Sequence, residues 1–461
     1  MLLKSYRMEN RLLGSEAEDI NTLTGRIWVE SKKIWKVGFP AMLARLSQYG
    51  MFVVTQAFIG HIGELELAGY ALIQIITVRF SNGILFGMSS ATETLCGQAF
   101  GARQLHMLGV YLQRSWIINL VTATVLLPVF IFSGKIFKLL GEEEDIANSA
   151  GYISLWFIPM LYFFTLAFCV QKYLQTQLKN MIIGWVSAAS FAIHVVLSWM
   201  FVSKLRWGIP GAMAAMGISS WLIIIGELVY IFGGWCPLTW EGFTAAAFSD
   251  LLPMIKLSIS SGVMFCLEFW YNAILVLLAG YMKNAQTQIS AMSVCLNITA
   301  LEFMLCVGFI AGSSVRVSNE LGRGDARAAK FSIKVIFSLS MCLGIFFFVI
   351  CLVFGRQIAS LFTDEVSVIE AVSSLSYLLA FSVLLNSLQA VLTGVAVGAG
   401  RQSMVAYVNI SCYYLIGIPI GLVLGYVAHM EINVSNFLCF SRFVSFLWFF
   451  LFQEPCHPPL S

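Results

Sequence analysis

Eleven stretches of largely apolar residues, each long enough to cross a membrane, recur along this chain of 461 residues. A helix needs about 20 apolar residues to span the hydrocarbon core of a bilayer. The stretches cover residues 37–60, 67–92, 108–132, 151–171, 181–202, 210–232, 255–281, 289–315, 331–354, 371–393 and 404–428. Charged residues make up 11% of the chain, whereas soluble domains contain about 25%. The sequence therefore predicts an all-α integral membrane protein, and its net charge of +3 does not suggest a nucleic-acid partner.

The positions of Lys and Arg predict the orientation, because these residues are enriched in cytoplasmic loops. If the N-terminus lies in the cytoplasm and the spans alternate, 18 basic residues face the cytoplasm and six face the other side. Residues 1–31 carry charges of both signs and no apolar core, so we expect a disordered cytoplasmic tail without a cleavable signal. The expected location is the vacuolar or the plasma membrane.

The C-terminal end departs from this pattern. Residues 437–452 form an aromatic run of 16 residues that Arg442 interrupts. Such a run is short for a span, and it either inserts as a twelfth helix or re-enters the membrane. We therefore treat residues 431–461 as an atypical C-terminal segment, in which a twelfth helix is unusual or missing.

An internal repeat divides the chain into two halves. Residues 97–103 resemble residues 318–323 at an offset of about 221, and two further pairs of segments recur at nearly the same offset. An even number of spans per repeat gives both halves the same orientation, which predicts a pseudo-two-fold axis along the membrane normal and a pathway between the halves. The predicted organisation is an N-lobe of six helices (32–232), a cytoplasmic connector (233–254) and a C-lobe with helices seven to eleven (255–430).

Two carboxylates inside predicted spans are the candidate proton-coupling groups. Glu268 lies halfway along the seventh span and Glu302 halfway along the eighth. A charge at this depth costs at least about 2.5 kcal/mol, so such residues usually face a cavity and have a function. If the two approach each other, one of them holds a proton near neutral pH. The alternative for each is a structural hydrogen bond to a neighbouring helix.

Polar side chains at helical spacing mark further candidate positions. Ordinary hydrogen bonding between helices is the alternative for each of them. The candidate cavity or substrate residues are Tyr271, Asn272, Asn386, Gln389, Gln48, Gln56 and His194. The candidate gating or helix-bending residues are Pro40, Glu93 and Arg316.

The sequence contains no signature of an enzyme, a cofactor or a metal site. A GxxxxGK[ST] loop for nucleotide binding is missing, so an ion gradient is the expected energy source. The 11 cysteines include no CxxC pair, and most lie within apolar runs, where we expect them to be small core residues.

Four longer motifs carry a family resemblance. They read GHIGELELA at 60–68, ETLCGQAFGA at 93–102, SVRVSNELG at 314–322 and GVAVGAG at 394–400. With these motifs the chain resembles the multidrug and toxic compound extrusion (MATE) family, in particular its plant DETOXIFICATION members, from about residue 30 to about residue 428.

The resemblance implies twelve helices in two bundles of six that form a V-shaped cleft, and proton-coupled antiport of organic cations, alkaloids or flavonoids. In plant members a glutamate of helix seven is a proton site, and it matches Glu268. Some members also use an aspartate of helix ten, but the matching residue here is Asn386, which cannot titrate. This difference makes Glu302 the candidate for a second proton site. The last helix and charged tail of the family are missing after about residue 430.

The favoured function is a proton-coupled antiporter that exports or sequesters small organic solutes as a monomer in the lipid bilayer. A sugar symporter of the major facilitator type also has two bundles of six, but the four motifs argue against it. A lipid flippase or scramblase and a non-functional truncated transporter isoform are the remaining alternatives.

Overall fold

The computed structural model describes residues 22–280, 285–360, 363 and 365–419, and within these ranges every regular element is helical. The label η marks π-helical segments, apart from η4, which is a 3₁₀ turn. In chain order the elements are α2 (Leu23–Gly60), α3 (Glu64–Ile73), η1 (Gln74–Val78), α4 (Arg79–Gly101), α5 (Leu105–Ile131), α6 (Ser133–Leu139), α7 (Glu144–Trp156), α8 (Ile158–Thr176), α9 (Met181–Ser198), η2 (Trp199–Lys204), α10 (Gly208–Tyr230), η3 (Ile231–Trp235), η4 (Ala245–Phe248), α11 (Leu251–Gly280), α12 (Ala285–Gly322), α13 (Ala326–Ser360), α14 (Val366–Ser374), α15 (Ser376–Gly398), α16 (Gln402–Asn409) and η5 (Ile410–Gly417).

The predicted spans correspond to these helices. Eight helices of the described ranges are long and apolar enough to cross a membrane, and the consecutive pair α7 and α8 makes a ninth if it counts as one bent span. The two other predicted spans are helical as well. However, α2 carries several Lys and Arg residues, and the last span continues beyond the described residues. The atypical segment 431–461 and its possible twelfth helix lie outside the described residues.

The span predicted over residues 151–171 is a bent pair of helices rather than one continuous helix. The structure has two helices here, α7 and α8, which meet at an angle of 47°. Pro159 lies at the start of α8. Proline has no N–H group to donate into the preceding turn, and its ring clashes with that turn, so the helix cannot continue unbent.

The prediction of a disordered tail over residues 1–31 is wrong at its end, because residues 23–31 are helical. Helix α2 begins at Leu23, where the side chain of Thr22 accepts a hydrogen bond from the backbone N–H of Gly25. This is a typical N-cap. Glu30 is buried in an ion pair with Arg316, so the first turns of α2 are held by the second half of the chain. Residues 1–21 lie outside the described ranges.

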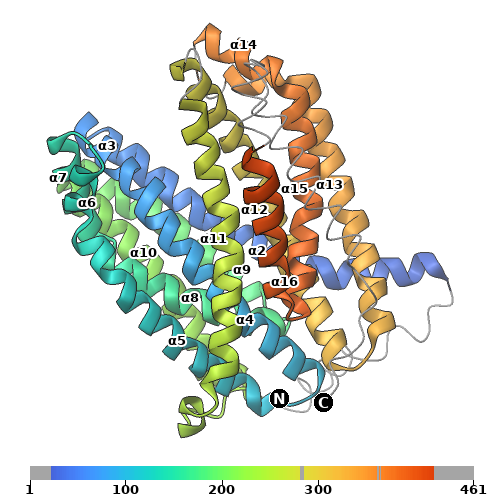
Figure 1. Cartoon of the computed structure of the whole chain (residues 1–461). Helices are drawn as coiled ribbons and strands as arrows, with labels where there is room; N and C mark the ends of the chain where they lie inside the picture. The colour runs from blue at the N-terminus through green and yellow to red at the C-terminus, as the bar shows by residue number, and fades with distance from the viewer. Residues whose placement is uncertain (1–21, 281–284, 361–362, 364, 420–461) are drawn as a thin grey trace.

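The helices form two groups that approach each other at one end (Figure 1). We call the helices from α2 to η3 the N-half and those from α11 to η5 the C-half. In the view of Figure 1 the N-half lies on the left and the C-half on the right, except that the first part of α2 crosses to the right. The groups are closest at the lower end, which contains the end of α4 and the start of α11, and they diverge toward α7 and α14.

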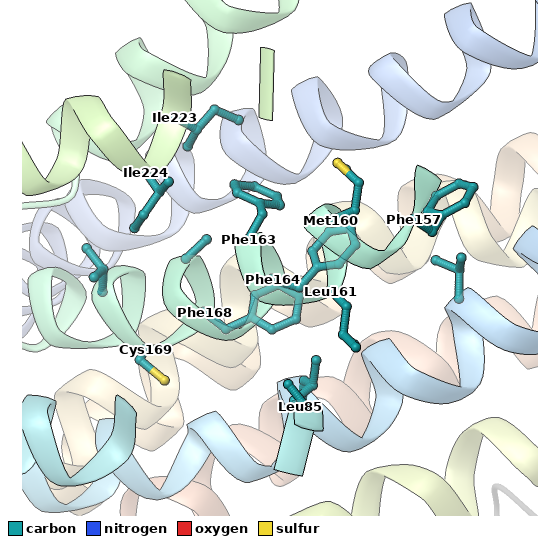
Figure 2. Packing of buried hydrophobic residues seen from close by; sticks show 14 of the residues in the cluster. Leu85, Phe157, Met160, Leu161, Phe163, Phe164, Phe168, Cys169, Ile223 and Ile224 are labelled. Carbon is teal, nitrogen blue, oxygen red and sulfur yellow. The ribbon is translucent and has the colours of Figure 1, made fainter. Parts of the chain in front are cut away.

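Each half has its own apolar core. The core of the N-half follows α8, where Leu161 lies toward Leu85 and Phe163 lies toward Ile223 and Ile224 (Figure 2). Four separate clusters fill the C-half, and one of them takes in Ile34 and Met42 of α2. The two halves are therefore packed as separate units that share contacts through α2 and α4.

The segment between the halves is fixed to the N-half. Residues 236–250 lie between η3 and α11 and cross the end of α5. Gln113 of α5 donates to the carbonyl of Gly242 over 2.9 Å and accepts from the backbone N–H of Thr244 over 3.0 Å. Arg114 donates to the carbonyl of Ala246 over 3.1 Å. The predicted connector thus makes side-chain hydrogen bonds to one half.

Pairs of glycines bring the two halves into backbone contact. A Cβ built on Gly308 of α12 would lie 2.7 Å from the carbonyl oxygen of Gly38 in α2. A Cβ built on Gly87 of α4 would lie 2.8 Å from the Cα of Gly262 in α11. Gly87 and Gly308 are equivalent positions of the repeat, 221 residues apart, and α2 and α11 are the first helices of the two halves. The contact of α12 with α2 therefore corresponds to the contact of α4 with α11, as a two-fold relation requires.

The repeated motif itself forms the contact at the centre of this relation. A Cβ on Gly101 of α4 would overlap the carbonyl of Asn319, and a Cβ on Gly322 of α12 would overlap the carbonyl of Gln98. Both pairs of equivalent residues are 221 positions apart. Gly101 meets Asn319, and the equivalent residues Gly322 and Gln98 meet in the same way. The helices α4 and α12 therefore cross on the pseudo-two-fold axis.

Equivalent polar side chains beside this crossing make corresponding hydrogen bonds to the opposite half. Gln98 of the N-half donates to the carbonyl of Gly398 over 3.4 Å, and its equivalent Asn319 donates to the carbonyl of Thr176 over 3.3 Å. Thr94 adds a donor to the carbonyl of Val397 over 2.6 Å. Hydrogen bonds between the halves therefore close the same end at which the glycines meet.

The crossing predicts opposite effects for two Gly→Ala substitutions inside helices. Alanine favours helix formation by about 0.5–1 kcal/mol relative to glycine, so Gly217→Ala, with open space around its Cβ, should leave stability unchanged or raise it. Gly101→Ala should lower stability, because its methyl group has no room. The apparent melting temperatures of the purified variants in detergent test this. Equal midpoints for the two variants would contradict the close crossing.

Candidate functional site

Glu302 of α12 is a buried carboxylate that accepts hydrogen bonds from two residues of α15. The Glu302 side chain accepts hydrogen bonds from Asn386 Nδ2 over 2.5 Å, from Ser387 Oγ over 2.8 Å and from Cys306 Sγ over 2.6 Å. Its exposed fraction is 1%. Buried carboxylates are tolerated where several donors reach their oxygens. The residue that the family resemblance marks as a lost acid, Asn386, is thus a direct partner of the remaining one.

The second carboxylate, Glu268 of α11, lies one helical turn further along the same face of α15. Gln389 Nε2 donates to Glu268 Oε1 over 3.2 Å and to the Tyr413 hydroxyl over 2.5 Å. The ring of Tyr413 stacks on Tyr271, with 4.6 Å between the centroids. Glu268 and Gln389 are partly exposed, whereas Glu302 and Asn386 are buried. One carboxylate of the pair is thus more accessible than the other.

Sequence reasoning found most of this group and missed part of it. Glu268, Glu302, Tyr271, Asn386 and Gln389 were predicted separately, and the structure brings them together around α15. Three partners were missed: Ser387, Cys306 and Tyr413. Cys306 follows Glu302 by four residues, so helical spacing could have indicated it. Asn272 lies on α11, and its side chain is outside the described part of the structure.

The N-half holds a buried ion pair of its own. Lys172 Nζ of α8 lies 2.5 Å from Glu93 Oε2 of α4, and the side chains are 5% and 1% exposed. The ammonium group also lies over the ring of Phe86, 5.2 Å from its centroid. Lys172 is one of the 18 basic residues of the predicted cytoplasmic side, and it is buried inside the protein rather than exposed in a loop. Glu93, a candidate gating residue, is held in the same way.

The other candidate residues of the N-half have separate surroundings. His194 is buried on α9, with Nε2 at 3.2 Å from the hydroxyl of Thr55 in α2 and 3.4 Å from that of Ser198. Gln48 is buried and accepts a hydrogen bond from Arg45, while Gln56 is exposed. His194 links two helices, as interhelical polar residues commonly do.

Arg316 of α12 is the centre of an ionic cluster. Its guanidinium group contacts Glu30 of α2 at 2.7 Å and Glu320 at 2.6 Å, and Ser332 of α13 donates to Glu30 over 2.5 Å. Burial alone would raise the pKa of the Glu30 carboxyl, but the nearby Arg316 charge and its hydrogen bonds keep that pKa below its ordinary value. The candidate gating residue Arg316 thus ties three helices together at the end where the halves meet.

Pro40 lies inside α2, near the glycine contact between α2 and α12. A Cβ on Gly184 of α9 would lie 3.2 Å from Pro40, so this part of α2 packs closely on α9. A bend of functional importance at Pro40 stays a prediction. Within the described residues, no group of three or more His, Cys, Asp or Glu side chains could hold a metal ion.

Comparison with known proteins now identifies the family. The MatE family model matches residues 40–200 and 261–423, and the two matched segments begin 221 residues apart, which is the offset of the internal repeat. This protein is a member of the MATE family of membrane transporters. It is 49% identical to Protein DETOXIFICATION 24 of Arabidopsis thaliana over 434 residues, which cover 92% of this chain and 87% of that protein. Protein DETOXIFICATION 20 of the same plant is 50% identical over 420 residues, covering 91% and 86%.

Solved structures show the same fold. The crystal structure of the eukaryotic MATE transporter AtDTX14 superposes with a TM-score of 0.84 at 30% identity, covering 93% of this chain and 97% of that one. An outward-facing multidrug resistance MATE transporter of the MOP superfamily has a TM-score of 0.77 at 15% identity, covering 92% and 95%. The chain is therefore a multi-pass membrane transporter of the MATE fold, and its family consists of transporters rather than enzymes.

The buried ion pair of the N-half predicts non-additive mutant stabilities. Glu93→Gln or Lys172→Met alone leaves one charge buried without its partner, which costs about 3–5 kcal/mol. The double variant removes both charges, so it should be more stable than either single variant. Melting temperatures in detergent for the three variants and the wild type test this. A double variant whose loss equals the sum of the single losses would show that the pair is not coupled.

Asn386→Asp should change how transport depends on pH. The new carboxyl would face Glu302 at hydrogen-bonding distance, and two carboxylates this close cannot both be charged, so the pair would retain a shared proton. We expect the pH profile of transport of a fluorescent organic solute into proteoliposomes to move by about one pH unit or more. Asn386→Ser, which adds no acid, serves as the control. Coinciding profiles for Asn386→Asp and the wild type would contradict the contact.

Proposed function

We propose that this transporter exchanges protons for small organic solutes, and that Glu268 is the group that binds and releases the proton. The observation that carries the proposal is the pair of carboxylates that α15 binds: Glu268 of α11, partly exposed and bound by Gln389, and Glu302 of α12, buried and bound by Asn386. Proton exchange with water requires an accessible carboxyl group, which favours Glu268 over Glu302. A charge on Glu302 disfavours a second charge nearby, so proton uptake at Glu268 is favoured.

The same helix offers a route from the proton site to the contact between the halves. An ionised carboxylate only accepts hydrogen bonds, whereas a protonated one can also donate. A proton on Glu268 therefore changes the hydrogen bonds that Gln389 makes to Glu268 and Tyr413. About two turns further on, α15 packs on α12 at Gly394, and the carbonyl of Val397 accepts from Thr94 of α4. A shift of α15 would loosen this closure.

The orientation of the chain gives this motion a direction. The count of Lys and Arg favours a cytoplasmic N-terminus, and the ends of α4 and α12 then lie on the cytoplasmic side. The structure is closed at that end, and the helices diverge toward the other (Figure 1). We propose that this state opens away from the cytoplasm and that the N-lobe (32–232) and C-lobe (255–430) rock about the glycine crossing. Such motion delivers a solute out of the cytoplasm, across the plasma membrane or into the vacuole.

The solutes we propose are small organic molecules, among them xenobiotics, flavonoids, alkaloids and organic cations. This range rests on the DETOXIFICATION relatives and on the aromatic residues of the N-half core. The chain would act as a single copy, with protons and solute as its partners. A lipid flippase is the competing function, and it would move labelled lipid without a pH gradient. A truncated, inactive isoform would transport neither.

Glu268→Gln should abolish transport that is driven by a pH gradient while the protein remains folded. The amide keeps the shape of the side chain but cannot bind a proton. The measurement is the uptake of a fluorescent organic solute into proteoliposomes with an acidic interior, together with monodispersity in detergent. Glu144→Gln, at an exposed ion pair with Lys138, is the matched control and should keep wild-type uptake. Wild-type rates in Glu268→Gln would overturn the role of this carboxylate.

A further inference from the structure

Arg45 is a charged side chain in the middle of α2 that the proposed proton site does not use. Its guanidinium group donates to the side-chain oxygen of Gln48 over 3.0 Å. The same group lies over two aromatic rings, 5.1 Å from the centroid of Phe86 and 5.0 Å from that of Phe168. Phe168 lies at one end of the row of aromatic side chains along α8 (Figure 2). A cation at this depth is costly, so it is expected to have a function.

The surroundings of Arg45 differ from those of the buried structural cations. Arg316 contacts two carboxylates and Lys172 contacts one. Within the described ranges of the chain, no acidic side chain forms an ion pair with Arg45. The carboxylates of Glu227 and Glu93 interact with its charge only from beyond ion-pair distance. The Arg45 residue as a whole is only partly buried.

A second donor next to Arg45 lacks a partner. Gln48 is 6% exposed, and its side-chain nitrogen is buried without a hydrogen bond. A buried donor that is left unpaired costs about 1–3 kcal/mol, so such groups commonly await a ligand or water. The oxygen of the same amide is already bound to Arg45, which fixes the direction in which its nitrogen points. The two donor groups, the Arg45 guanidinium and the Gln48 amide nitrogen, therefore belong to neighbouring side chains, and the rings of Phe86 and Phe168 lie next to the guanidinium.

The position of this group is between the halves of the transporter. The ring of Phe86 lies near the charged groups of both Arg45 and Lys172, and it also contacts the ring of Phe265 in α11, with 5.1 Å between the centroids. A molecule that binds at Arg45 would thus touch the N-half directly and lie next to the C-half. This is the location that a transported solute occupies when two repeats rock about a shared contact.

We propose that Arg45, Gln48, Phe86 and Phe168 form a recognition site for the anionic group of a flat aromatic solute. The guanidinium plane can bind a carboxylate or phenolate through two parallel hydrogen bonds, and the Gln48 amide supplies a third donor. Aromatic faces stack on planar ligands. The site thereby selects acidic aromatic compounds over organic cations. The inference rests on the proposed function in that the bound molecule is taken to be the transported one.

Binding of two fluorescent probes to the purified, full-length protein in detergent tests this site. Fluorescein is planar and carries carboxylate and phenolate groups, whereas ethidium is planar and cationic. We expect Arg45→Gln to weaken fluorescein binding, measured by fluorescence anisotropy, by about tenfold or more, and not to weaken ethidium binding. Arg45→Lys keeps the charge but loses the planar fork, so it should fall in between. Arg79→Gln, at another arginine inside a predicted span, should match the wild type.

Gln48→Leu gives an independent test if Arg45 variants do not fold, because it removes the second donor and leaves the charge. It should weaken fluorescein binding about threefold or more, which is the effect of losing one ordinary hydrogen bond. Unchanged fluorescein binding in Arg45→Gln or in Gln48→Leu would overturn the proposal, as would a wild-type protein that binds ethidium and not fluorescein. Binding in detergent needs no pH gradient, so a failure of proton coupling would leave this readout intact and would show only in uptake.

Discussion

The approach of α4 and α12 at Gly101 and Gly322 is the contact on which the rest of the structure depends. Backbone meets backbone there, since neither position has room for a Cβ. The close approach also brings Gln98 and Asn319 within reach of carbonyls in the opposite half. In lipid, where helices are not driven together by water, small residues and interhelical hydrogen bonds of this kind hold bundles in place. Because α15 packs on α12 and bonds to α4, the carboxylate pair and the closed end share one helix.

The two-fold relation also shows where the halves have diverged, and the charged side chains lie at these positions. Arg316 and Glu30 form an ion pair, while the residues at the repeat offset of 221, Leu95 and Leu251, lie in one apolar cluster. The ion pair of Glu93 and Lys172 in the N-half corresponds at the same offset to the uncharged Ser314 and Thr393. The repeat therefore accounts for the shared architecture, and departures from it give each half its own electrostatic character. The proposed proton site lies in one half and the proposed arginine site in the other.

Helical spans, the repeat and the two carboxylates could all be predicted from the sequence, since each depends on local composition or spacing. The bend between α7 and α8 was missed, although Pro159 signals it, because apolar residues continue without interruption across it. The helical start of α2 could not be found from its polar composition, since contacts with α12 and α13 stabilise it. The burial of Lys172 and the pairing of Asn386 with Glu302 depend on neighbours 79 and 84 residues away, which no local pattern encodes.

The central claim is that the proton state of Glu268 determines how the two halves meet, and distances between spin labels in liposomes test it most directly. Labels at Gln104 and Arg327, introduced as an encoded amino acid because the chain has 11 cysteines, would report on opposite halves at the closed end. The account predicts that the populations of short and long distances in the wild type change with pH, and that Glu268→Gln shows one pH-independent distribution. A wild-type distance distribution that does not change with pH, or a Glu268→Gln distribution that still changes with pH, would contradict the account.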